Sequence, residues 1–208
     1  MSQAEWAISL DLDGVVIWRP PFQLGAFTKR HIKRRGAAMY APPTEIPEFE
    51  RRIKEDRLKP SELLSYLMHA IRPVSVSARE FIEENSPTAD IYANTGRVAR
   101  TPWVDMTKRT LKRGGLNGAF EGYFFKPEGT RTMLSKLEAI DRLSESYEQV
   151  THFDDNPADA LPIAARLPNV RVVIVQDLST GMLYSRDEAR RYPNVTRIAK
   201  LRPVNNSA

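Results

Sequence analysis

The side chains best suited to chemistry are four aspartates in two short clusters far apart in the chain. Asp11 and Asp13 occur in the segment DLDG, and Asp154 and Asp155 occur in the segment FDDNP. One carboxylate can attack phosphorus to form an acyl phosphate if a second one protonates the leaving oxygen and later takes a proton from water. Two residues apart on an extended segment, Asp11 and Asp13 can point to the same side and supply both groups. Four crowded acids repel one another unless a hard cation neutralises them, and their oxygen ligands favour Mg²⁺.

A third cluster, Asn94-Thr95-Gly96-Arg97, carries groups that bind phosphate. The Thr95 hydroxyl and the Gly96 amide can hold phosphoryl oxygens, and Arg97 can form two parallel hydrogen bonds with a phosphate. Each cluster also has an ordinary structural explanation. DLDG is common in turns and Ca²⁺ loops, and the segment that begins with Asp154 can cap a following helix. The joint presence of the three clusters favours phosphoryl transfer.

Strand and helix patterns alternate along the chain and place the three clusters at strand ends. Short apolar runs predict strands over residues 6–10, 90–93, 122–125, 149–153 and 170–175, and helical patterns cover 78–84, 98–113, 131–143 and 158–167. This alternation predicts an α/β fold with a doubly wound, Rossmann-like, mostly parallel sheet flanked by helices. Ligands bind at the carboxyl ends of the strands in such sheets, so we expect the clusters to converge on one edge.

Composition limits the classes of protein that this chain can belong to. Its 208 residues, 41% of them hydrophobic and 27% charged, suffice for one sizeable core. The absence of cysteine excludes disulfides and thiol catalysis and fits a reducing compartment. No signal peptide pattern or membrane-length apolar run occurs, so we expect a soluble, cytoplasmic protein with no membrane partner. The net charge of +5 favours anionic partners, although the basic segments 29–35 and 97–113 can equally be solvated surface.

Residues 19–73 interrupt the alternation between the first two strands. Three helical patterns, over 22–35, 45–57 and 60–71, predict a small helical insertion. We assign residues 1–18 and 74–203 to the α/β core and 204–208 to a frayed tail. Trp18 and Arg19 lie at the hinge, where they line the entrance to a site or simply pack. His152, beside the second acid pair, is expected to be a core histidine rather than a ligand.

Asp11-Leu12-Asp13-Gly14-Val15-Val16, Thr95, a downstream lysine and Asp154-Asp155 resemble, in this order, the four motifs of the haloacid dehalogenase superfamily. The resemblance covers residues 6 to 176. It implies an Mg²⁺-dependent phosphomonoester hydrolase. An aspartate at the position of Asp13 is the phosphatase pattern, since the superfamily's dehalogenases lack it. The insertion at 19–73 lies where the superfamily places a cap that excludes water and selects substrates.

The resemblance also implies a role for each motif residue. Asp11 would be the nucleophile, Asp13 the general acid and base, and Thr95 the phosphate ligand. Asp154 and Asp155 would ligate Mg²⁺ together with Asp11 and the main-chain carbonyl of Asp13. Asp159 would lie outside the direct ligands.

Two lysines can fill the remaining motif, in which a lysine offsets charge in the transition state. Lys126 precedes Pro127, as at the start of a segment common in the superfamily, whereas Lys136 flanks the apolar face of the predicted helix 131–143. We favour Lys136 for this role and Lys126 as a substrate contact. The alternative for either is a solvated surface lysine.

A narrower resemblance concerns the class of substrate. Thr95-Gly96-Arg97, Thr101-Pro102-Trp103-Val104 and Phe125-Lys126-Pro127-Glu128-Gly129 are similar in order to the phosphatase half of polynucleotide kinase-phosphatases. No P-loop occurs, so a kinase half is absent from this sequence. The expected partner is a phosphorylated small molecule, or a nucleotide or nucleic-acid end carrying a 3′ phosphate. A phosphomutase and a non-catalytic module that binds phosphate or nucleic acid are the remaining alternatives.

Overall fold

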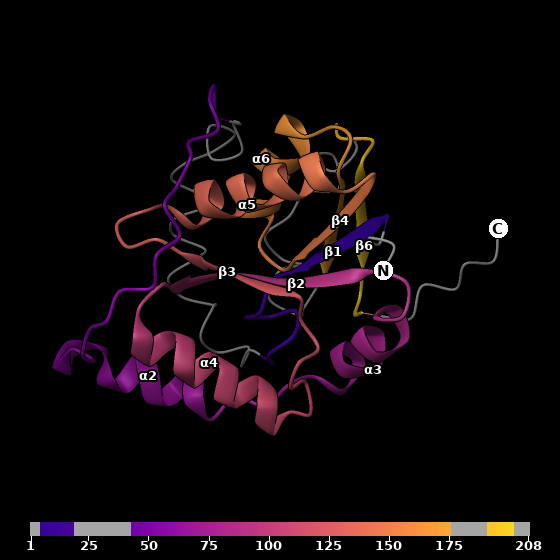
Figure 1. Ribbon diagram of the computed structural model, residues 1–208. Coiled ribbons are helices and arrows are strands. Elements are labelled where there is room, and N and C mark those ends of the chain that lie inside the picture. The colour runs from indigo at the N-terminus through magenta and orange to yellow at the C-terminus, as the bar shows by residue number, and fades with distance from the viewer. Residues whose placement is uncertain (1–4, 19–42, 176–190, 202–208) are drawn as a thin grey trace.

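The computed structural model describes residues 5–18, 43–175 and 191–201. A six-stranded sheet forms its centre, with strand order β3-β2-β1-β4-β5-β6, and all five neighbouring pairs are parallel (Figure 1). The strands are β1 Trp6–Leu10, β2 Asp90–Val98, β3 Gly122–Lys126, β4 Gln149–Asp154, β5 Arg171–Val175 and β6 Val195–Ile198. The chain order is reversed at β1, from which neighbouring strands run outward on both sides. The predicted doubly wound α/β sheet is therefore confirmed.

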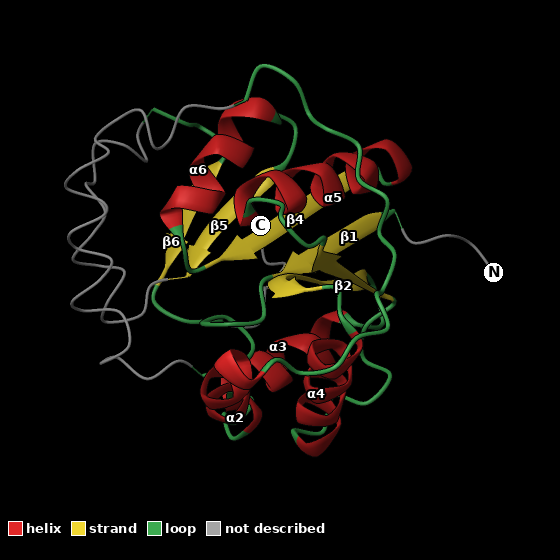
Figure 2. Cartoon of the chain, turned by 90° about the vertical axis from the view of Figure 1, so that its left-hand side faces the viewer, coloured by secondary structure: helices red, strands yellow, loops and turns green. Residues whose placement is uncertain are grey.

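Helices cover both faces of the sheet (Figure 2). One face carries α5 (Thr132–Ser146) and α6 (Pro157–Arg166), and the other carries α3 (Val76–Asn85) and α4 (Thr101–Arg113). The short helix α2 (Leu63–Ala70), preceded by a 3₁₀ turn over Pro60–Glu62, packs beside α4. No helix in the described ranges is both long and apolar enough to cross a bilayer.

The sequence of β1 shows how one strand serves two cores. Successive side chains of a strand point to opposite faces. Ile8 and Leu10 pack in the core beneath α3 and α4, whereas Ala7 packs in the core beneath α5 and α6. All three are fully buried. Both faces of the strand are apolar because both are covered, as is usual in parallel sheets.

Boundaries differ from prediction where backbone pairing continues past the apolar run. β2 extends to Val98 rather than ending at residue 93, because Thr95 and Val98 still pair with β3 around a local irregularity. The following helix therefore begins at Thr101, with Pro102 in its first turn. β6 was not predicted, since its four half-buried residues form a short edge strand without a continuous apolar run.

The predicted helix over 45–57 is wrong, because this part of the chain contains no helix. Residues 43–59, which we call the strap, run in extended form across the edge of the sheet. Pro47 removes a backbone donor from any helix there. Lys54 makes backbone hydrogen bonds to Ala99 (2.9 Å) and Thr101 (3.0 Å) instead. The backbone of Lys54 thus forms its hydrogen bonds with residues after β2 rather than with neighbouring turns of a helix.

Arg51 attaches the strap to α5 and β3. Its guanidinium donates to Glu138 (2.9 Å from Nε) and to the carbonyls of Phe125 (3.0 Å) and Ser135 (2.5 Å). It also lies over the ring of Phe124, 5.1 Å from its centroid. Glu138 is buried and also pairs with Arg142, which donates to the Phe49 carbonyl of the strap (3.3 Å). Arg51 and Arg142 therefore both attach the strap to α5.

The ends of the 19–73 insertion lie side by side. The Trp18 amide donates to the Pro73 carbonyl (2.9 Å), and the Ser75 amide donates to the Val16 carbonyl (2.8 Å). Within the insertion, the predicted helix over 60–71 is confirmed as the 3₁₀ turn and α2. The predicted helix 22–35, the basic segment 29–35, Arg19 and the tail 204–208 lie outside the described residues. The division into core and cap stays a prediction.

Candidate active site

A cavity of about 400 Å³ opens at the carboxyl ends of β1, β2 and β4. It is the place where the three polar clusters were expected to converge. Each of the clusters contributes lining residues: Asp11, Asp13, Gly96, Arg97, Asp155 and Asn156. The sheet therefore brings together residues that are up to 145 positions apart in the chain.

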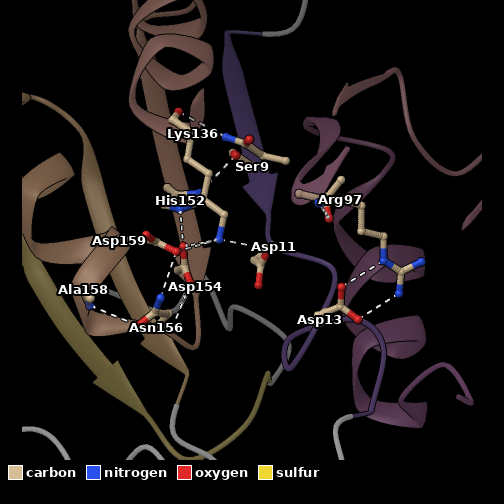
Figure 3. A network of polar contacts seen from close by, with 12 residues as sticks. Ser9, Asp11, Asp13, Arg97, Lys136, His152, Asp154, Asn156, Ala158 and Asp159 are labelled. Carbon is tan, nitrogen blue, oxygen red and sulfur yellow. Dashed lines mark hydrogen bonds and ion pairs between the residues drawn. The ribbon is translucent and has the colours of Figure 1, made fainter. Parts of the chain in front are cut away.

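Lys136 connects the nucleophile candidate to the second acid pair (Figure 3). Its Nζ lies 3.0 Å from Oδ1 of Asp11 and 2.7 Å from Oδ2 of Asp154, with Asp159 at 3.7 Å. Burial alone would lower the pKa of Lys136, but these three carboxylates outweigh it and raise the pKa well above its usual value. With 2% of its surface exposed, Lys136 is not a solvated lysine. The structure places it, of the two lysines considered, at the acid cluster.

The acids of the site form an oxygen cage suited to a divalent cation. Carboxylate oxygens of Asp11, Asp154 and Asp155 all lie within 4.8 Å of one another, and the three residues are buried. Burial raises the pKa of Asp11 well above its usual value; Lys136 opposes this, whereas the charges of Asp154 and Asp155 add to it. A bound cation would relieve this crowding of like charges. The donor set, all hard oxygen, fits Mg²⁺.

Asp154 is held rigidly at the end of β4. It accepts hydrogen bonds from His152 Nε2 (3.3 Å) and from the backbone amide of Asn156 (2.8 Å), besides that of Lys136. Burial would raise the pKa of Asp154, but Lys136 and His152 outweigh it and hold the pKa well below its usual range. His152 is fully buried and also contacts Ser9 (3.1 Å), so it is the predicted core histidine.

In the segment that begins with Asp154, one residue, Asn156, caps the following helix α6. The Asn156 side chain accepts from the Ala158 amide (3.2 Å) and caps α6, and it also donates to Asp159 (2.9 Å). Asp154 and Asp155 are not the cap. Asp155 lines the cavity, and Asp154 is buried next to Lys136.

Gly14 allows the loop after β1 to approach Asp155. Its φ of +100° lies in the region that favours glycine, and a Cβ there would overlap the Asp155 carboxylate. The backbone of the loop is closed by hydrogen bonds from Val16 and Ile17 to the Leu12 carbonyl (3.1 and 2.6 Å). Glycine at this position is therefore needed for both its backbone conformation and its lack of a side chain.

Replacing Gly14 with alanine is expected to destabilise the protein more than the same change at Gly118. Gly118 has a comparable φ of +72° with open space around it, so Gly118→Ala reports only the backbone cost, about 1–2 kcal/mol. Gly14→Ala adds the steric overlap, roughly 1–3 kcal/mol more. Urea unfolding of both variants in EDTA measures the difference. Equal losses of unfolding free energy would contradict the close approach to Asp155.

Asp13 points away from Asp11, toward Arg97 (Figure 3). Arg97 donates to both of its carboxylate oxygens (2.9 and 2.8 Å), and Arg72 lies 3.3 Å from Oδ1. Burial would raise the pKa of Asp13, but the hydrogen bonds and charge of Arg97, with Arg72, hold the pKa of that carboxyl well below its usual range. The two aspartates thus lie in opposite electrostatic surroundings, and those of Asp13 favour its ionised form.

Arg97 lines the cavity and also makes several contacts within the protein. Besides Asp13, it donates to the Thr107 hydroxyl (2.8 Å) and contacts the Met106 sulfur (3.7 Å). Thr95 is buried, does not line the cavity, and accepts the Arg97 amide (3.2 Å). Of the predicted phosphate ligands, Gly96 and Arg97 reach the cavity.

Lys126 and Trp18 lie outside the cavity lining. Lys126 donates to the Thr130 carbonyl (3.1 Å) at the end of β3. Trp18 is 51% exposed next to Pro73. Neither the substrate contact predicted for Lys126 nor an entrance role for Trp18 gains support from this arrangement.

Several residues of the site were not predicted. They come from the turn before α2, from α2 itself, and from the first turns of α4 and α5: Glu62, His69, Trp103 and Thr132 line the cavity, and Arg72 reaches Asp13. The available signals were weak, since His69 is one of three histidines and Arg72 simply precedes a proline. The packing of α2 on α4 brings Glu62, His69 and Trp103 together at the carboxyl edge of the sheet.

Comparison with known proteins bears on the fold. No protein-family model and no curated protein matches the chain. A haloacid dehalogenase-like hydrolase from Burkholderia xenovorans matches with a TM-score of 0.52 and 16% identity, over 96% of this chain and 94% of that one. A haloacid dehalogenase-like family hydrolase from Xanthomonas campestris matches with a TM-score of 0.50 and 10% identity, over 96% and 92% of the two chains. The chain has the fold of the haloacid dehalogenase-like hydrolases.

Proposed function

We propose that the protein is an Mg²⁺-dependent phosphomonoester hydrolase that works through an aspartyl-phosphate on Asp11. The observation that carries this proposal is the position of Asp11. Its buried carboxylate lines an open cavity, contacts a buried lysine, and lies within a cluster of three acids. Asp13 at the neighbouring wall favours a phosphatase over a dehalogenase, because the dehalogenases of the superfamily lack this second aspartate.

In the first step, an Asp11 carboxylate oxygen attacks phosphorus, and the bond from phosphorus to the leaving oxygen breaks. The leaving oxygen takes a proton and departs as an alcohol. In the second step, water attacks the phosphorus of the aspartyl-phosphate and loses a proton, and the bond from phosphorus to Asp11 breaks to release inorganic phosphate. Asp13 carries both proton transfers in this scheme: it gives a proton to the leaving oxygen in the first step and takes one from water in the second. The proton that it takes from water in one cycle is the proton that it gives to the leaving oxygen in the next. Its two arginine neighbours favour the ionised form, which is the form that accepts the proton of water.

The remaining residues of the site handle charge. Lys136 holds Asp11 and Asp154 in place and offsets negative charge as the phosphoryl group is transferred. Asp11, Asp154, Asp155 and the main-chain carbonyl of Asp13 would hold Mg²⁺. When bound, the cation neutralises the acids and the phosphoryl oxygens and so lets the anionic substrate enter.

A metal-dependent phosphatase assay tests the proposal. Purified protein is mixed with p-nitrophenyl phosphate, sugar phosphates and nucleotides, in millimolar Mg²⁺ or in EDTA. We expect phosphate release that requires Mg²⁺. No metal-dependent turnover of any phosphomonoester would overturn the proposed function.

A nucleic-acid end is the second candidate substrate, and the exposed face of α4 favours it. Lys108, Arg109, Lys112 and Arg113 are exposed on this helix, whose first turn contributes Trp103 to the cavity. Such a basic surface attracts a phosphate backbone. Release of phosphate from 3′-phosphorylated oligonucleotides would support this candidate. Binding that weakens steeply with salt, without phosphate release, would instead favour a non-catalytic module.

A further inference from the structure

The wall of the cavity that faces the acid cluster comes from different elements and carries different chemistry. Glu62, at the end of the 3₁₀ turn, His69 on α2 and Trp103 in the first turn of α4 all line it. These elements lie together on the α4 side of the sheet (Figure 2). A phosphoryl group bound at Asp11 would leave the organic part of the ester facing this wall.

His69 is held in a defined orientation. Its Nδ1 lies 2.7 Å from the Ser65 carbonyl one turn earlier in α2, so Nδ1 carries the hydrogen and donates it. The ring packs edge-on against Trp103, with centroids 5.6 Å apart and an interplanar angle of 79°. Trp103 is in turn held by Tyr66 (5.7 Å, 75°) and is largely buried. Since a carbonyl can only accept, the neutral ring keeps Nε2 as a hydrogen-bond acceptor.

Burial favours the neutral form of the imidazole. It lowers the pKa of His69, and Arg72 and Arg97 lower the pKa further, whereas the charge of Asp13 and the hydrogen bond to the Ser65 carbonyl oppose this shift. With Nδ1 donating to Ser65, the neutral ring presents Nε2 to the cavity side as a hydrogen-bond acceptor.

Glu62 adds a second acceptor to the same wall. Its carboxylate is fixed by Arg100 Nη1 (2.7 and 3.0 Å) and by the Lys59 amide (3.1 Å). A carboxylate has about four lone-pair positions, so it retains capacity for a further donor. The wall thus offers two acceptors to a ligand.

The cations of the cavity are already paired. Among the described lining residues, Arg97 binds Asp13, and Lys136 binds Asp11 and Asp154. A second anionic group on the substrate would face Glu62 without a cation of its own. Hydroxyl groups, in contrast, supply the donors that both acceptors need.

We propose that His69 is a specificity-determining residue that accepts a hydrogen bond from a hydroxyl of the organic group. The site would then favour phosphate esters of uncharged polyols, such as sugars, over esters of hydrocarbon alcohols. This inference rests on the proposed phosphatase function and adds the class of leaving group to it.

The test compares two esters of the same carbon skeleton, glycerol 2-phosphate and isopropyl phosphate. Only the first carries hydroxyls beside the ester carbon. We expect kcat/KM of the wild type to be about tenfold higher for glycerol 2-phosphate, as one or two hydrogen bonds provide. His69→Phe keeps the packing on Trp103 but removes the acceptor, and it should lower this ratio about threefold or more. A partial folding defect cancels in the ratio because it lowers both rates equally.

Leu64→Ser is the matched control, since Leu64 is on α2, 74% exposed and outside the cavity lining. It should leave the ratio of the two kcat/KM values unchanged. A wild type without preference for glycerol 2-phosphate, or a ratio that His69→Phe does not move, would overturn the inference. Activity on p-nitrophenyl phosphate with none on the other two esters would also overturn the inference, but it would leave the phosphatase proposal intact. No phosphate release from these three esters, from sugar phosphates or from nucleotides would overturn the proposed function, and the inference with it.

Discussion

Replacement of Asp11 with asparagine is expected to lower kcat for phosphomonoester hydrolysis by about four orders of magnitude or more. The amide is nearly isosteric with the carboxylate but is a poor nucleophile, so it cannot form the acyl phosphate. Steady-state kinetics with p-nitrophenyl phosphate in Mg²⁺ measures the loss. Activity close to that of the wild type would refute Asp11 as the nucleophile.

The stability of the same variant separates a chemical defect from a folding defect. Asp11 lies among like charges, which with burial raise the pKa of its carboxyl despite Lys136. Removal of that charge in EDTA should therefore leave the free energy of unfolding unchanged or slightly higher. Asp105→Asn, on the exposed face of α4, is the matched control and should retain full activity. If the Asp11→Asn protein is both inactive and unfolded, rapid quenching of the wild type during turnover of a labelled phosphate ester tests the mechanism instead. Labelled aspartyl-phosphate must accumulate in that experiment, and its absence would reject the mechanism.

Binding of Mg²⁺ is expected to stabilise the folded protein substantially. At a concentration about a hundredfold above its dissociation constant, a ligand that binds only the native state adds roughly 2.7 kcal/mol. For a chain of this length, that corresponds to a rise in Tm of about 5–11 °C. The physical cause is the crowding of carboxylate oxygens from Asp11, Asp154 and Asp155 within 4.8 Å of one another. Thermal melts in millimolar Mg²⁺ and in EDTA measure the shift.

Two controls make the melting experiment specific. Sodium chloride at matched ionic strength should not reproduce the rise in Tm, because general screening does not fill the site. Asp155→Ala should abolish the shift, whereas Asp105→Ala should keep it. If the wild type melts identically in Mg²⁺ and EDTA across the millimolar range, these acids are not a magnesium site of useful affinity.

The sequence by itself determined the α/β architecture and the location of the acid clusters. Apolar runs that end in Asp11 and in Asp154 predict strands whose carboxyl ends meet at one edge, and the sheet confirms this. This inference succeeds because the spacing of apolar side chains along a strand can be recognised in the local sequence. A parallel strand that is covered on both sides needs apolar residues on both faces. The identity of His152 as a core histidine followed from the same pattern.

Local pattern was misleading where the partner of a residue is distant. The spacing of apolar residues over 45–57 predicted a helix, yet this segment is extended because Arg51 finds Glu138, 87 positions away, and Lys54 finds the backbone beside Arg100. The ion pair of Arg97 was likewise not predicted: Asp13, 84 positions back in the chain, accepts hydrogen bonds from its guanidinium. The role of Arg97 as a phosphate ligand stays a prediction. A charged group pairs with whatever opposite charge the fold brings near, and spacing in sequence does not record that.

Tertiary structure alone decided which lysine lies at the acids and which residues face the substrate. Lys126 and Lys136 are both compatible with the motif order, and only the packing of α5 on the sheet buries Lys136 between Asp11 and Asp154. His69, Glu62 and Arg72 carried no chemical signal in sequence. His69 and Glu62 line the cavity where α2 packs on α4, and Arg72 lies against Asp13. The physical reason is common to all of them. Local sequence specifies which face of an element is apolar, whereas the direction of a polar side chain depends on burial and on charges contributed by other segments.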